Sequence, residues 1–118
     1  MPRFRGLRAA FVNCSLKAKA SESHTATLMR HAAAVMTKQG VEVDTIHALE
    51  HQIAFGMSPD MTEHGAAHDD WPLLFKRIIQ ADILVLGTPI WLGVKSSMGT
   101  QVVERLYSNS SDKNDRGQ

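Results

Sequence analysis

The stretch Leu7-Arg8-Ala9-Ala10-Phe11-Val12-Asn13, together with the loop that follows it, decides the fold of this chain. Its largely apolar residues predict a buried strand. Residues 14–25 are rich in small hydroxyl residues and lysine, and an Ala/Leu/Met-rich helix comes next. A strand that runs through such a loop into a helix brings N–H groups and the positive end of the helix dipole together. The stretch therefore predicts an anion site.

Length and composition indicate one ordinary globular domain. The chain has 118 residues, of which 43% are hydrophobic, and this is typical of a folded domain rather than a disordered one. We find no apolar run near the roughly 20 residues that span a bilayer and no signal-peptide pattern. The one cysteine, Cys14, excludes an internal disulfide. These features predict a cytoplasmic protein.

Charge is distributed unevenly along the chain although the net charge is only +1. Before Gly40 there are seven Lys/Arg residues and one acidic residue, whereas between Gly40 and Phe75 there are seven acidic residues and no Lys/Arg. The first strand, loop and helix are thus the positive part of the molecule and could attract a phosphorylated ligand. The alternative interpretation is a chance division between solvated faces.

The first half of the chain predicts a βαβ unit. A helix is expected over residues 23–39, with Ser23 as its N-cap and Gly40 as its stop. The residues predicted to share its apolar face are Leu28, Ala32, Val35 and Met36. Residues 41–46 alternate apolar and polar side chains and predict a second strand toward the sheet edge. The unit should cross over right-handed onto a parallel sheet.

Residues 47–69 show no periodicity and predict a long loop, which is often functional or mobile. From Asp70 onward, apolar residues recur with helical spacing, and Pro72 occupies a tolerated early position. The residues expected on that helix's apolar face are Trp71, Leu74, Phe75, Ile78 and Ile79. Residues 82–86 are nearly all apolar and predict a central strand covered on both faces.

A second loop, residues 87–95, leaves that strand, and Ser96 is a credible cap for a third helix. The residues expected on one face of this helix are Gly99, Val102, Val103 and Leu106. Residues 108–118 form a polar tail that is expected to be disordered. The chain thus predicts an α/β fold with helices on both faces of a parallel sheet in the order 2-1-3. Its first and third strands border a topological switch point, where open α/β sheets bind ligands.

The two loops at this switch point carry a family resemblance. Asn13, Ser15 and Lys17 are followed by Ser23-His24-Thr25, and the second loop reads Thr88-Pro89-Ile90-Trp91-Leu92-Gly93. Over roughly residues 7–107 the chain resembles the N-terminal part of flavodoxin-like NAD(P)H-dependent FMN reductases and related quinone reductases. His24 stands where that family usually has asparagine. The family fold needs five strands, so the resemblance implies a partial domain over residues 1–107, either a truncated chain or a natural fragment.

The resemblance implies an FMN site built from both loops. Ser15, Ser23 and Thr25 would donate hydroxyl bonds to the phosphate, Lys17 would add a cation, and Trp91 would flank the isoalloxazine ring. The alternative interpretations are ordinary capping, a solvated lysine and a core or interface tryptophan. The full set of expected cofactor-binding residues is Ser15, Lys17, Ser23, His24, Thr25, Thr88, Pro89, Ile90, Trp91, Leu92 and Gly93.

As to activity, the resemblance implies an FMN-dependent oxidoreductase that passes electrons from NAD(P)H to a flavin, quinone or similar small acceptor. It also implies a homo-oligomer, and we expect no nucleic-acid or membrane partner. Two alternatives stay open: a flavin-binding electron carrier, and a truncated non-catalytic fragment. FMN would carry the redox chemistry, so we nominate no catalytic acid, base or nucleophile.

Two further patterns are weaker candidates for chemistry. Cys14 follows the first strand as in a Cys-x5-Arg phosphatase loop, but Ala20 stands at the arginine position. Without that guanidinium a bound phosphate lacks its bidentate partner, so a small buried thiol is the favoured interpretation. His64 and His68 have a spacing that can bind metal on a helix. With Gly65 between them and no third ligand nearby, solvated loop histidines are favoured, and we expect no metal site.

Overall fold

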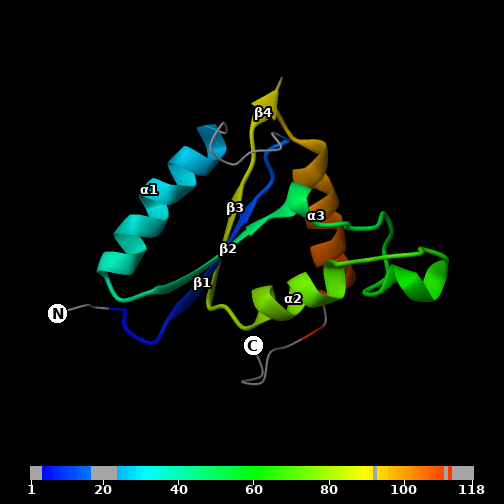
Figure 1. Ribbon diagram of the computed structural model, residues 1–118, viewed down its shortest axis with the longest axis horizontal. Coiled ribbons are helices and arrows are strands. Elements are labelled where there is room, and N and C mark those ends of the chain that lie inside the picture. Colours follow the sequence, from blue (N-terminus) through cyan, green and yellow to red (C-terminus); the bar gives the residue numbers. More distant parts are fainter. Residues whose placement is uncertain (1–3, 17–23, 92, 111, 113–118) are drawn as a thin grey trace.

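The computed structural model describes residues 4–16, 24–91, 93–110 and 112, without the side chain of Trp91 (Figure 1). Lys17, Ser23 and Leu92 therefore lie outside the described residues, as does most of the predicted tail. The elements are β1 (Arg8–Asn13), α1 (His24–Lys38), β2 (Glu42–His47), η2 (Ala48–Glu50), η3 (Met61–His64), α2 (Trp71–Ile79), β3 (Ile83–Gly87), β4 (Ile90–Trp91), β5 (Val94–Lys95) and α3 (Ser97–Ser108). No described helix is both long and apolar enough to cross a bilayer.

A parallel sheet in the order β2-β1-β3 forms the middle layer, which confirms the predicted topology. β1 pairs with β2 from Arg8↔Glu42 to Asn13↔His47 and with β3 from Ala9↔Ile83 to Asn13↔Gly87. Five of the six β1 residues are buried because this strand has a neighbour on each side and helices on both faces. The carboxyl ends of all three strands therefore meet at one edge, next to Asn13.

The burial predicted for the third strand is wrong. Its apolar sequence predicts a central strand covered on both faces, but β3, at the edge of the described sheet as the order 2-1-3 requires, is only partly buried. The Leu84 side chain is 43% exposed.

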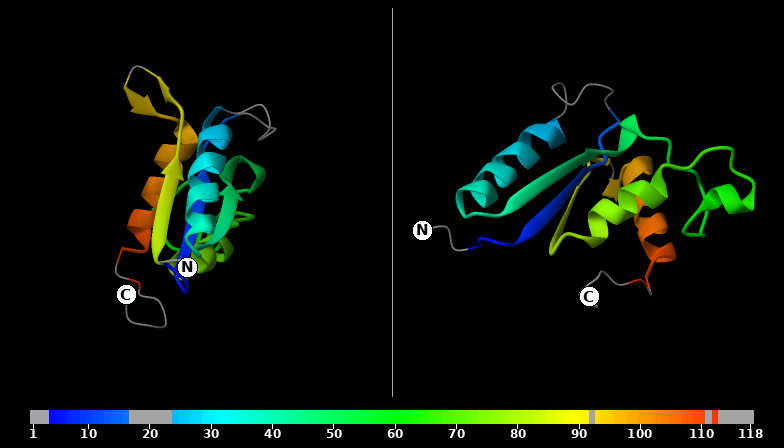
Figure 2. Two further views of the ribbon diagram at one scale, coloured as in Figure 1. Left: turned by 90° about the vertical axis from the view of Figure 1, so that its left-hand side faces the viewer. Right: turned by 60° about the horizontal axis from the view of Figure 1, so that its bottom comes forward.

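α1 covers one face of the sheet, while α2 and α3 cover the other (Figure 2). Met29 of α1 packs in a buried cluster with Phe11, Ala33 and Met36 lie against this cluster, and Ala26 is also buried. Of the predicted apolar face only Met36 packs on the core, and the rotation is otherwise wrong: Leu28 and Val35 are 72% and 64% exposed. The small side chains at positions 26 and 33 let the helix approach the sheet closely, which the bulkier Leu28 would prevent.

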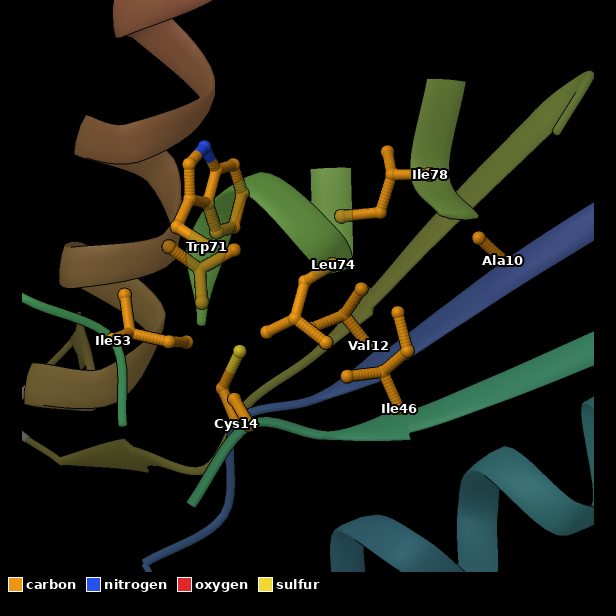
Figure 3. Packing of buried hydrophobic residues seen from close by; sticks show 10 residues of the cluster. Ala10, Val12, Cys14, Ile46, Ile53, Trp71, Leu74 and Ile78 are labelled. Carbon is orange, nitrogen blue, oxygen red and sulfur yellow. The ribbon is translucent and has the colours of Figure 1, made fainter. Parts of the chain in front are cut away.

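The second face carries the larger core (Figure 3). Trp71, Leu74 and Ile78 of α2 are buried against β1 and β2, which confirms the predicted face of this helix. Val102 of α3 joins the same cluster, while the predicted face residue Val103 is 39% exposed. Trp71 is 1% exposed, and its Nε1 donates a hydrogen bond to Asn109 Oδ1 at 2.9 Å. The indole thus packs in the core and satisfies its polar atom.

α3 holds the long loop between η2 and α2 in place. Gln101 Nε2 donates to the carbonyl of Ile53, and Arg105 donates to the carbonyls of Ala54, Ser58 and Pro59. Arg105 also forms an ion pair with Asp69 at 2.7 Å, and both side chains are fully buried. The absence of periodicity in residues 47–69 therefore reflects a loop whose backbone is bound by side chains instead of by a strand or helix partner.

Candidate functional site

The loops after β1 and β3 meet at the carboxyl edge of the sheet, as the sequence predicts. The Cys14 N–H donates to the Gly87 carbonyl at 2.7 Å, which extends the pairing of the two strands by one residue. The Ser96 hydroxyl then donates to the Cys14 carbonyl at 2.8 Å. A residue at the start of α3 thus joins the two loops that are predicted to border the switch-point crevice, although its side chain was predicted only as a cap.

Ser96 is buried and links three elements. Its Oγ accepts a hydrogen bond from the Gly99 N–H at 3.0 Å, which confirms the predicted cap of α3. Its N–H donates to Thr88 Oγ1 at 3.0 Å, and the two hydroxyl oxygens lie 3.1 Å apart. A Cβ on Gly99 would lie 3.1 Å from Thr88 Oγ1, so glycine allows this close approach. The loop after β3 is therefore fixed by short polar contacts.

Beyond Thr88 the second loop forms a hairpin that sequence reasoning missed. β4 pairs antiparallel with β5, with Ile90 opposite Lys95 and Trp91 opposite Val94. Gly93 has φ +77° in the turn, a conformation that glycine adopts without steric cost. The hairpin extends past the end of the sheet (Figure 1), and Ile90 is 68% exposed. A Leu-Gly turn between the β-branched residues Ile90 and Val94 was the signal that could have indicated it.

The first loop begins with a tight polar turn. The Ser15 N–H donates to Asn13 Oδ1 at 2.9 Å, and Ser15 is 3% exposed. This side-chain turn replaces backbone pairing where β1 ends. α1 begins at the same edge of the sheet (Figure 1).

The start of α1 has the character of an anion site. Thr25 is half-buried and His24 is exposed, and the first turn of the helix contains no acidic residue. The positive end of the helix dipole and a hydroxyl group are both favourable to a phosphate. The hydroxyl group and the helix dipole at this edge have the chemistry that the phosphate of a flavin mononucleotide requires. How closely the expected site residues approach that ligand stays a prediction.

Cys14 belongs to the core and not to the crevice. Its side chain is fully buried, and Figure 3 shows the sulfur directed into the cluster that contains Leu74 and Val12. Burial raises the pKa of the Cys14 thiol to about 11. A thiol in this state is a poor nucleophile, in agreement with its interpretation as a small apolar core residue.

The two histidines considered as a metal pair occupy different local structures. His64 is exposed and ends η3, whereas His68 Nε2 lies 2.7 Å from Asp70 Oδ1 in the following loop. In the part of the chain that the structure describes, no group of three or more His, Cys, Asp or Glu residues is arranged to hold a metal ion.

An open parallel α/β sheet, with its polar loops at the switch point between β1 and β3, defines a flavodoxin-like protein. The chain belongs to the NADPH-dependent FMN reductase family, whose model matches residues 7–114. The RosB crystal structure, which contains the bound intermediate 8-demethyl-8-formylriboflavin-5'-phosphate, superimposes with a TM-score of 0.72 and 30% identity. That match covers 86% of this chain and 42% of RosB.

Two curated relatives are similar in sequence. The 8-demethyl-8-aminoriboflavin-5'-phosphate synthase of Streptomyces davaonensis is 31% identical over 105 residues, which are 85% of this chain and 41% of that protein. A divalent metal cation transporter, MntH, of Mycobacterium bovis is 52% identical over 117 residues, which are 99% of this chain and 17% of that protein. This chain therefore spans well under half the length of either relative.

Proposed function

We propose that this chain forms the FMN-binding part of an oxidoreductase that takes electrons from NAD(P)H and passes them to a flavin, quinone or similar acceptor. One observation carries the proposal: Ser96 joins the loops after β1 and β3 at the carboxyl edge of the sheet, where α1 also begins. Family membership and the flavin phosphates named for RosB and the Streptomyces synthase support the same ligand.

In this proposal the start of α1 holds the phosphate. The helix dipole and the Thr25 hydroxyl would stabilise its charge, with Ser15 at the base of the loop and Lys17 and Ser23 completing the contacts. The absence of acidic residues from the first turn supports this assignment, because a carboxylate there would repel a phosphate that carries nearly two negative charges.

The second loop would border the flavin ring. Thr88 fixes the backbone that leads into Pro89, and the exposed hairpin would carry Trp91 toward the ring. When bound, FMN supplies the redox chemistry by accepting a hydride from NAD(P)H and passing two electrons to the acceptor. The protein's own contribution is to bind and orient that ring and to keep water from it.

Thr25→Asp tests the phosphate assignment. Two unit charges 4 Å apart in water repel by about 1 kcal/mol, so a carboxylate beside a phosphate of charge near −2 should weaken FMN binding at least about tenfold. An acidic residue in the first turn stabilises a helix, so lost binding could not be attributed to a lost helix. Thr27→Asp, in the same turn, is the matched control and should have a smaller effect.

The measurement is a flavin fluorescence titration with FMN and with riboflavin, which lacks the phosphate. Thr25→Asp should lower the affinity for FMN and leave riboflavin affinity nearly unchanged. Equal losses for both ligands, or none for FMN, would remove the phosphate from the start of α1. Oxidation of NAD(P)H with an added quinone separates the reductase from a flavin-binding electron carrier, which would show no turnover.

The homo-oligomer is also part of the proposal. Large apolar side chains project from the hairpin and the long loop, with Ile90, Val94 and Phe55 at 68%, 60% and 81% exposed. A second copy of the chain that covers them would remove apolar surface from water. Light scattering coupled to size exclusion should give twice the mass of one chain, and a mass of one chain would contradict this part.

A further inference from the structure

A cavity lies between α1 and the carboxyl-end halves of β1 and β2. It has a volume of about 210 Å³. The crevice predicted at the switch point is instead bordered by β1 and β3, on the other side of the central strand. The floor of this cavity is apolar and includes Phe11, Met29 and Ala33.

One polar group of the cavity has no partner. His47 ends β2, and because Ile46 faces the α2 side of the sheet, strand alternation directs the His47 ring toward α1. His47 is 8% exposed, and its Nε2 has no hydrogen-bond partner among the described residues. A buried polar atom without a partner is unfavourable, so a ligand that satisfied it would gain affinity.

The role of Nε2 follows from the other ring nitrogen. Nδ1 of His47 lies 3.3 Å from Glu50 Oε1. A carboxylate only accepts hydrogen bonds, so the hydrogen of the neutral ring is on Nδ1, and Nε2 is left as an acceptor. His47, which lines the cavity, therefore carries the acceptor that a ligand with an O–H or N–H group would use.

The rim of the cavity adds a positive charge. Arg30, on α1, lines the cavity and is exposed, and its guanidinium lies 3.1 Å from Thr27 Oγ1. Asn13 lines the cavity beside His47, its partner in the strand register. A guanidinium binds a carboxylate through two parallel hydrogen bonds, so an anionic group at the rim would match Arg30.

We propose that this cavity binds a small hydroxylated aromatic acid. An apolar cavity of about 150 Å³ holds benzene, so 210 Å³ accommodates one ring with two small substituents. The ring would lie against Phe11 and Met29, its hydroxyl would donate to His47 Nε2, and its carboxylate would face Arg30. This site requires no flavin.

The experiment uses 4-hydroxybenzoate as the probe and isothermal titration of the full chain as the measurement. Benzoate lacks the hydroxyl and phenol lacks the carboxylate, and each should bind about tenfold more weakly because one hydrogen bond or ion pair is lost. His47→Phe should abolish the preference for 4-hydroxybenzoate over benzoate. His31→Phe, an identical substitution at an exposed position of α1, is the control and should retain it.

A cavity-filling variant gives a second, structural readout. Ala33→Leu should block binding of 4-hydroxybenzoate while the protein stays folded, as judged by circular dichroism. Ala34→Leu, on the exposed side of the same helix, should leave binding unchanged. Binding that survives Ala33→Leu, benzoate that binds as tightly as 4-hydroxybenzoate, or no saturable binding with a Kd below about 1 mM would each overturn the proposal.

Discussion

Loss of the buried Asp69–Arg105 ion pair should destabilise this fold more than any surface substitution. The Arg105 side chain donates to both Asp69 oxygens, at 3.1 and 2.7 Å, and its guanidinium carbon lies 5.7 Å from the Trp71 ring centroid. Asp69 also accepts three backbone N–H bonds, from Ala54, Met61 and Trp71. The pair thus connects α3, α2 and the long loop.

Removal of one partner from a buried ion pair costs about 3–5 kcal/mol, because the other charge stays buried. We therefore expect Asp69→Asn to lower the free energy of unfolding by that amount. Asp44→Asn is the matched control, since Asp44 also pairs with an arginine, Arg77, but with 35% and 40% of the two side chains exposed. Exposed pairs contribute roughly 0–1 kcal/mol, so the control should change stability little.

The same pair gives stability a pH dependence of known sign. Burial alone would raise the pKa of Asp69, but the hydrogen bonds from Arg105 and the backbone outweigh it and lower the pKa from 3.8 to about 2. A carboxylate whose pKa is lower in the folded state than in the unfolded state stabilises the fold at pH values above its unfolded-state pKa. This stabilisation is lost as the pH falls through the folded-state pKa. At about 1.4 kcal/mol per pKa unit, roughly 2–3 kcal/mol should be lost between about pH 4 and pH 2.

Urea unfolding, followed by circular dichroism, measures both effects. The wild-type midpoint should fall between pH 4 and pH 2, and Asp69→Asn should show a lower midpoint at pH 7 with a shallower dependence in the acid range. The reasoning is refuted if Asp69→Asn costs no more than Asp44→Asn, or if it keeps the wild-type acid dependence. Asp69→Glu, which retains the charge, should recover part of the stability.

Four further predictions follow from the crevice and the core. Ser96→Ala should cost about 1–2 kcal/mol in urea unfolding and weaken FMN binding by fluorescence, whereas Ser97→Ala should do neither. Cys14 should react with a thiol reagent at pH 8 far more slowly in the folded chain than in urea, because burial raises its thiol pKa to about 11. Gly93→Val should lower thermal stability more than Gly93→Asn, since a β-branched residue tolerates φ +77° poorly. Ser96→Ala and Arg105→Met should destabilise additively within about 0.5 kcal/mol.

Much of the fold could be predicted from the sequence because the spacing of apolar residues along a single helix or strand depends on that element alone. The helix from Trp71 and the strand ending at Asn13 follow from side-chain spacing alone, and the observed bounds differ from the predicted ones by a residue or two. The order 2-1-3 follows from crossover geometry. The rotation of α1 could not be predicted this way, because alanines at 26 and 33 favour close packing that hydrophobicity does not encode.

Two features of the candidate site were beyond local reasoning for a different reason. The links from Ser96 to Cys14 and from Arg105 to Asp69 span 82 and 36 residues of sequence. Nothing near either residue indicates its distant partner. An arginine on a helix and an aspartate in a polar loop are usually exposed to solvent. Only the three-dimensional arrangement shows that they are buried together.

These long-range contacts give the two ends of α3 separate tasks. The N-terminal end, at Ser96, fixes the crevice through Thr88 and Cys14, whereas Arg105, in the last turn, fixes the long loop. Nine residues of helix place the two about 14 Å apart, beyond the range over which substitutions usually couple. Substitutions that change the polar contacts around Ser96 should therefore leave intact the buried ion pair that stabilises the fold.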